Sequence, residues 1–192
     1  FYKAQTIVVD AAQTNIAKLS SHPIMVNPGT EGLYVQGLVK SVIEQDLIDE
    51  ERTAPYPQAL AALKQAAQRI SLETVSAMTG VEMDQIHETA KIFAEASRSV
   101  IICGEGILRQ PAGYRHMLNL VDLAWLTGKL GRKGCGINTY TEEANEQGAL
   151  DMGVAPEFLP GQMPIEDTAA REKISQAWEG ALPATGQGSH LL

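Results

Sequence analysis

The chain alternates short apolar runs with longer amphipathic segments. Runs at 5–11 and 23–29 are β-branched and end in Asp10 and in a Pro-Gly pair, and 99–107 ends in two glycines. Such runs are typical of buried strands in a parallel sheet. The segment 30–48 has apolar residues at helical spacing, which predicts a helix of about five turns. A short helix fits between the first two strands, and further helices are predicted at 57–70, 71–81, 82–97, 112–131 and 166–182.

Strands that alternate with helices indicate an α/β fold with a mostly parallel sheet. The pattern stops after Gly131, where about 30 residues rich in Gly, Asn and Pro show no strong periodicity. A loop of this length is uncommon inside a compact domain unless it is functional or leaves one domain for another.

Composition restricts the classes of partner. Hydrophobic residues make up 44% of the chain and charged residues 20%, as in ordinary globular proteins. The formal net charge of -8 disfavours nucleic acid or anionic lipid as the main partner. Lys129, Arg132 and Lys133 cluster in a Gly-rich stretch, which is more typical of a solvated turn, although a small basic pocket stays open.

Chemistry-bearing residues form no recognisable catalytic or metal site. Cys103 and Cys135 lie 32 residues apart without a neighbouring Cys or His, so neither a zinc nor an iron-sulfur site is expected from this chain, and a reduced, cytoplasmic protein fits best. The four histidines have no ligand spacing, no GxSxG motif is present, and no apolar run approaches the roughly 18 residues of a membrane span. The chain begins without Met, so we expect a piece of a larger protein.

The ends of the three predicted strands are the places to seek a site, because ligands of parallel sheets bind beyond the carboxyl ends of the strands. These ends are Asp10, the stretch 27–30, and Gly104 to Gly106. The two glycines allow either a tight strand-to-helix turn or the close approach of backbone to a ligand. No GxGxxG follows any strand, so a standard NAD site is not expected.

Asp10 and Glu31 each have a structural and a functional interpretation. Asp10 can cap the next short helix, and Glu31 can stabilise the start of the helix that follows the turn Pro28–Gly29–Thr30. Either carboxylate can also accept hydrogen bonds from a ribose or from a base with adjacent N–H donors, such as guanine. A helix start that carries a carboxylate suits such a donor-rich edge better than a phosphate.

Three segments, 7–49, 78–107 and 119–164, resemble consecutive stretches of one family. The family has a strand ending in Asp-Pro-Arg-x-Thr, then a strand ending in Pro-Gly-Thr-Asp and a long helix, and the stretch "NEQGALDMG" here is the most specific match. The chain is thereby similar to the molybdopterin oxidoreductase family, especially formate dehydrogenase catalytic subunits and the large iron-sulfur subunit of respiratory complex I.

The resemblance implies a Rossmann-like αβα domain within a larger multidomain protein. Residues 1–141 would be most of a dinucleotide-binding-like domain without its first strand or strands, and 142–192 the crossover to a neighbouring αβα domain. The full-length protein would bind bis(molybdopterin guanine dinucleotide) with Mo or W and an iron-sulfur cluster upstream. Its partners would be the remaining domains and electron-transfer subunits, with association to a membrane complex left open. The alternatives are an NADH dehydrogenase-like domain without a working pterin site and a generic Rossmann-like nucleotide-binding domain.

By the same resemblance, the cofactor contacts would come from the strand ends. They are Asp10, Thr14, Pro28, Gly29, Thr30, Glu31, Gly104 and Gly106. Formate dehydrogenases carry an Arg and a Gln where this chain has Thr141 and Glu143. A Thr cannot form the charge pair by which an Arg holds a carboxylate substrate, so formate oxidation is not a secure expectation.

Overall fold

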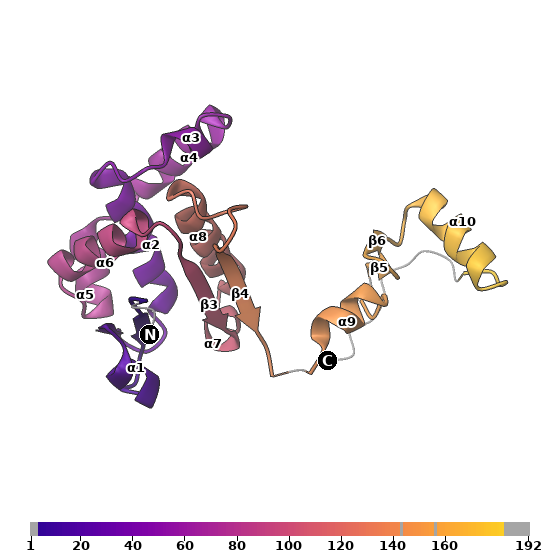
Figure 1. Cartoon of the computed structure of the whole chain (residues 1–192), viewed down its shortest axis with the longest axis horizontal. Helices are drawn as coiled ribbons and strands as arrows, with labels where there is room; N and C mark the ends of the chain where they lie inside the picture. The colour runs from indigo at the N-terminus through magenta and orange to yellow at the C-terminus, as the bar shows by residue number, and fades with distance from the viewer. Residues whose placement is uncertain (1–3, 143, 156, 183–192) are drawn as a thin grey trace. The chain divides into compact units, whose positions relative to one another are not determined.

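The computed structural model describes residues 4–142, 144–155 and 157–182, which form strands and helices, with helices α2 to α6 following one another between β2 and β3 (Figure 1). The strands are β1 (Ile7–Asp10), β2 (His22–Met25), β3 (Val100–Gly104), β4 (Gly136–Tyr140), β5 (Phe158–Leu159) and β6 (Met163–Pro164). The helices are α1 (Asn15–Leu19), α2 (Glu31–Glu44), α3 (Glu50–Thr53), α4 (Pro57–Ala67), α5 (Leu72–Thr79), α6 (Met83–Glu95), α7 (Glu105–Leu108), α8 (Gly113–Leu126), α9 (Glu146–Asp151) and α10 (Thr168–Ala177). Glu143 and His190 lie outside the described residues.

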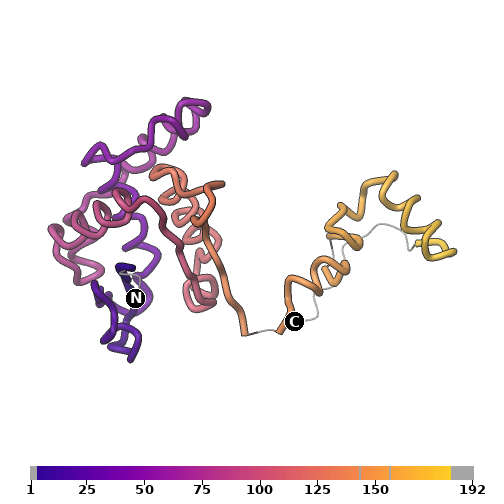
Figure 2. The backbone as a smooth tube through the Cα atoms, in the orientation of Figure 1, coloured from indigo at the N-terminus to yellow at the C-terminus, as the bar shows by residue number. Residues whose placement is uncertain are grey.

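The chain divides into two compact units between Tyr140 and Thr141 and passes from one to the other by a single segment (Figure 2). In the first unit β1 pairs with β2 and β3 with β4, both in parallel. In the second unit β5 and β6 pair antiparallel. The predicted α/β fold with parallel strands is confirmed, but the described strands form three separate pairs rather than one sheet.

Several predicted element boundaries change. The helix predicted to reach residue 48 ends at Glu44, because Asp46 takes a left-handed conformation with φ 55° and turns the chain. The strand predicted to reach residue 107 ends at Gly104 and runs directly into α7. Strand β4 was predicted as loop because it lies in the Gly-, Asn- and Pro-rich stretch after Gly131, although Ile137, Thr139 and Tyr140 favour strands, and it pairs in parallel with β3.

Helix α2 lies at the centre of the first unit and packs against α8, α6, α5 and α4. The apolar spacing that predicted it buries one broad face of the helix. One core cluster joins this face to β2, α5, α6 and α8 through Ile24, Val26, Tyr34, Leu38, Val39, Val42, Val75, Ile86, Leu123 and Leu126. A second cluster lies against β3 and β4, where Val35 packs with Cys103 and Leu120. Both parallel pairs are therefore attached to the same helix.

The second unit is held together by a smaller apolar cluster. Leu159, Ala170 and Ile174 are its buried members. Helix α10 begins at Asp167, whose carboxylate accepts hydrogen bonds from the backbone N–H groups of Ala169 and Ala170. The predicted helix over 166–182 is thus present in a shorter form with an ordinary N-cap.

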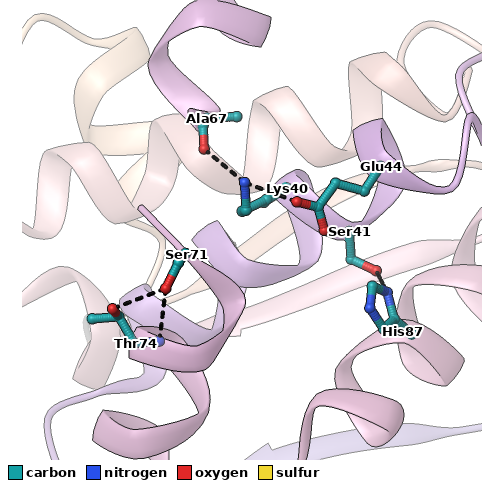
Figure 3. A network of polar contacts seen from close by, with 7 residues as sticks. All are labelled: Lys40, Ser41, Glu44, Ala67, Ser71, Thr74 and His87. Atoms are coloured by element: carbon teal, nitrogen blue, oxygen red, sulfur yellow. Dashed lines mark hydrogen bonds and ion pairs between the residues drawn. The ribbon is translucent and has the colours of Figure 1, made fainter. Parts of the chain in front are cut away.

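Polar side chains on one side of α2 are paired with neighbouring helices (Figure 3). The hydroxyl of Ser41, which is fully buried, lies 2.8 Å from Nδ1 of His87 in α6 and accepts a hydrogen bond from Gln45 Nε2 at 2.9 Å. At the start of α5, Ser71 Oγ accepts from the backbone N–H of Thr74 and caps the helix. The contact between Ser41 and His87 joins α2 to α6, whereas that of Ser71 stays within α5.

We predict that Ser41→Ala lowers the free energy of unfolding by about 1–3 kcal/mol, because it removes a buried hydroxyl that is the partner of a partly buried ring nitrogen and of an amide donor. Urea unfolding of the chain measures the change. Ser97→Ala is the matched control, since Ser97 is exposed. Equal urea midpoints for the two variants would show that the network contributes nothing.

Candidate functional site

The carboxyl ends of β1 and β2 lie at one edge of the first parallel pair. Asp10 is opposite Met25 in the register, and the backbone N–H of Val26 donates to the carbonyl of Asp10 at 3.0 Å. The turn at Pro28 and Gly29 follows two residues later. The first two predicted strand ends are therefore adjacent.

Asp10 closes a turn after β1, and Thr14 caps the helix that follows. Oδ1 of Asp10 accepts from the backbone N–H of Ala12 at 3.1 Å and closes a turn after the strand. Helix α1 is capped by Thr14, whose hydroxyl accepts from the N–H of Ala17 at 3.3 Å. The interpretation of Asp10 as the cap of this helix is wrong. Its second carboxylate oxygen meets no donor in the part of the chain that the structure describes.

The turn before α2 leaves the start of that helix without a side-chain cap. Gly29 has φ +80°, a conformation that favours glycine, and the space where a Cβ would stand is open. Thr30 occupies the N-cap position, yet its hydroxyl donates to the carbonyl of Asn27 at 2.6 Å instead of accepting from the helix. The first-turn N–H groups of α2 thus have no side-chain cap among the described residues.

Glu31 connects α2 to the loop between α7 and α8. Nε2 of Gln110 donates to Oε2 of Glu31 at 2.6 Å, although the two residues are 79 positions apart. Oε1 of Gln110 is a buried atom without a partner among the described residues. An unpaired buried acceptor is costly, and a ligand donor would satisfy it. No local pattern around Gln110 in the sequence pointed to this contact.

The ring of His116 covers the first turn of α2. A Cβ built on Gly32 would lie 1.9 Å from Nδ1 of His116, so only glycine allows the ring this close. The sequence showed no ligand spacing for His116, and in the structure its ring packs against Gly32 of α2. No group of three His, Cys, Asp or Glu side chains that could hold a metal occurs in residues 4–142, 144–155 and 157–182.

Gly104 and Gly106 lie at the turn from β3 into α7, as the structural interpretation of these glycines predicted. A Cβ on Gly104 would be 3.2 Å from the hydroxyl of Tyr140, whereas a Cβ on Gly106 would meet open space. Arg109, at the end of α7, forms an ion pair with Glu105 at 2.9 Å. Because Gln110 follows this short helix, the end of β3 is linked to the start of α2.

The groups gathered here are mostly hydrogen-bond acceptors. The carboxylates of Asp10 and Glu31 and Oε1 of Gln110 all accept, while the nearby cation Arg109 is paired with Glu105. Such a set suits a ligand edge with several N–H or O–H donors. Burial raises the pKa of the Cys103 thiol, which disfavours this residue of β3 as a nucleophile. The described helices also include none long and apolar enough to cross a membrane.

Sequence comparison finds one matching family model, molybdopterin oxidoreductase, over residues 5–173. The alpha subunit of an F420-dependent formate dehydrogenase from Methanocaldococcus jannaschii is 33% identical over 164 residues, which are 85% of this chain and 24% of that protein. Formate dehydrogenase H from Escherichia coli is 30% identical over 91% of this chain and 24% of its own length. An assimilatory nitrate reductase catalytic subunit from Bacillus subtilis is 27% identical over 98% of this chain and 27% of its own length.

Among solved structures, acetylene hydratase from Pelobacter acetylenicus is similar in fold, with a TM-score of 0.64 and 21% identity. The match covers 68% of this chain and 18% of that one. The chain thus spans about a quarter of the length of the curated relatives that it matches.

We predict that Gly32→Ala destabilises the chain by about 1–3 kcal/mol, because the new Cβ collides with the His116 ring. In open space the same change would favour the helix by about 1 kcal/mol. Urea unfolding measures the sign of the change.

Gly106→Ala is the matched control, since Glu105–Gly106 begin α7 as Glu31–Gly32 begin α2, and open space surrounds Gly106. The double variant Gly32→Ala/His116→Ala should recover most of the loss. If Gly32→Ala is as stable as Gly106→Ala, the ring does not lie over the helix start.

Proposed function

Because this chain belongs to the molybdopterin oxidoreductase family, we propose that it holds one guanine dinucleotide of a bis(molybdopterin guanine dinucleotide) cofactor in a redox enzyme of formate dehydrogenase type. The observation that carries the proposal is the acceptor pair formed by Glu31 and Oε1 of Gln110 at the uncapped start of α2.

The residues present fit a guanine base. Guanine carries an N–H and an NH2 group side by side, and a carboxylate can accept from both at once. Glu31 would take this edge, with the unpaired Oε1 of Gln110 accepting a further donor. A ribose hydroxyl would donate to the oxygen of Asp10 that the Ala12 turn leaves unused.

The other proposed contacts would provide shape more than charge. Pro28, Gly29 and Thr30 make the turn over which the nucleotide passes, and Thr14 holds the start of α1 beside Asp10. Gly104 and Gly106 allow a close approach of backbone at the end of β3, where Gly106 already faces open space. A positively charged residue is not part of this set.

The metal of the cofactor, Mo or W, supplies the two-electron chemistry, while this chain's residues bind and orient the nucleotide end. In the full-length protein we propose an iron-sulfur cluster upstream and electron-transfer subunits as partners. The alpha subunit of the Methanocaldococcus formate dehydrogenase is one such multisubunit relative by its name. In this proposal, residues outside this site determine which substrate the enzyme takes.

One observation favours the second candidate, a domain of an electron-transfer complex that keeps the fold without a pterin. Thr141 stands where formate dehydrogenases carry a substrate-binding Arg, so the chain lacks that charge. Two changes would each explain Thr141 in place of the Arg, namely a different substrate or the loss of the cofactor. Cofactor analysis therefore has to precede any assay for activity.

The domain organisation follows from the same proposal. Residues 1–141 form the dinucleotide-binding-like domain, and 142–192 the crossover and the start of a neighbouring αβα domain. In the described chain β1 pairs only with β2, and β3 only with β4. Since the matched relatives are about four times as long, a strand from elsewhere in the polypeptide is proposed to pair with β1 and β3 and to join the two sheets.

We predict that Glu31→Gln in the full-length protein lowers the guanine nucleotide that copurifies by about tenfold. The amide keeps the size of the side chain but loses the charge-assisted hydrogen bonds, which contribute about 1.5–3 kcal/mol. Acid extraction and chromatography of the released guanine nucleotide measure the content per protein.

Glu73→Gln is the matched control, because Glu73 is also a first-turn carboxylate, at the start of α5. If Glu31→Gln keeps its full nucleotide content and loses only about 0.5–1 kcal/mol of stability, Glu31 serves the helix terminus alone.

We also predict that the backbone N–H groups of β1 and β3 exchange with solvent at least about tenfold more slowly in the full-length protein than in the 192-residue chain, because the added strand would protect them. Hydrogen exchange with mass spectrometry compares the two proteins. Helix α4 should exchange equally in both, and equal exchange of β1 and β3 as well would contradict the strand.

A further inference from the structure

A hollow lies at the other end of the β3–β4 pair from the candidate site. It has a volume of about 420 Å³ and is lined by Arg98, Arg132 and Lys133. Arg98 precedes β3 and the other two precede β4, so the hollow is at the amino ends of these parallel strands. It shares no residue with the acceptor-rich site at the carboxyl ends.

Lys129 anchors the loop before β4 to the end of α6. The sequence placed Lys129 among the charges of a solvated turn, but its side chain is buried and its Nζ donates to the carbonyls of Ala94 and Ala96 at the end of α6. Burial lowers the pKa of this amine, and the neighbouring Arg132 acts in the same direction. A lysine at a helix C-terminus satisfies carbonyls that have no partner within the helix.

Arg98 is held against the same loop. Gly134 has φ +80°, and a Cβ there would lie 2.9 Å from Cδ of Arg98. The stem of Arg98 therefore lies directly on the backbone of Gly134, two residues from Arg132. The three exposed cationic residues thus come from two neighbouring segments and line one hollow.

No counter-charge accompanies the three cations. Within residues 4–142, 144–155 and 157–182, neither Arg98 nor Arg132 nor Lys133 forms an ion pair or a side-chain hydrogen bond. The chain as a whole carries a net charge of -8, so a hollow lined by three cationic residues runs against its composition. Cations held together repel one another, and an anion between them would relieve that repulsion.

We propose that this hollow binds the phosphate groups of a small phosphorylated ligand. Two guanidinium forks can each hold a phosphate in bidentate fashion, with the lysine as a third charge. A volume of about 420 Å³ is in the range of small-molecule pockets. Convergence on one hollow favours a compact multivalent anion over an extended acidic peptide, whose charges are spaced along a chain.

Calorimetric titration of the full-length protein with inorganic pyrophosphate at low salt tests the proposal. We expect binding that weakens about tenfold in Arg132→Gln and in Lys133→Gln, both exposed residues whose loss leaves the fold intact. Arg69→Gln removes the same charge elsewhere and should leave the affinity unchanged. A parallel titration with inorganic phosphate should give weaker binding at the same residues.

Three results would overturn the proposal. The wild-type protein fails to bind pyrophosphate, the two variants bind it as tightly as the wild type, or a hexaglutamate peptide binds more tightly than pyrophosphate. The last result would assign the hollow to an acidic protein segment. Because Arg132 and Lys133 lie apart from Glu31 and Asp10, these outcomes are independent of whether the guanine nucleotide is bound.

Discussion

The close packing of α2 against its neighbours is the constraint on which the first unit depends. Two glycines on this helix let other side chains come near, since Gly32 lies under the His116 ring and a Cβ on Gly37 would be 2.7 Å from Val75. The helix thereby joins the core beside β1 and β2 to the cluster beside β3 and β4. Its first turn is consequently fixed relative to the ends of both parallel pairs. The candidate site depends on this placement more than on any single side chain in it.

The two sites proposed in the first unit have opposite chemistry, one at the carboxyl ends and one at the amino ends of the strands. At the carboxyl ends, Glu31 and Gln110 present acceptors beside an uncapped helix start, which suits a donor-rich base. At the amino ends, three unpaired cations surround a hollow that suits phosphate. The net charge of -8 does not reveal this division, because it sums over the whole chain. The positive residues Arg98, Arg132 and Lys133 nevertheless line one hollow.

Much of the fold could be predicted from residue patterns, and the exceptions have physical causes. Helices α4, α5, α6 and α8 were found by their apolar spacing, because a half-buried helix must show that spacing. Strand β4 was missed since its stability comes from pairing with β3, a contact 36 residues away in register between Val100 and Gly136. Glu31 was proposed from its place after a strand, but Gln110 was not, because their hydrogen bond depends on how α2 and α8 pack. Lys129 was predicted to lie in a solvated turn, but its side chain is buried. The sequence of a loop does not show which of its charged side chains points into the protein.

The central claim is that the start of α2 holds the guanine end of a molybdopterin cofactor. Joint analysis of metal and guanine nucleotide in the purified full-length protein tests it most directly. The account predicts Mo or W together with guanine nucleotide in the same protein peak. A well-folded, active preparation without Mo, W or guanine nucleotide would contradict it.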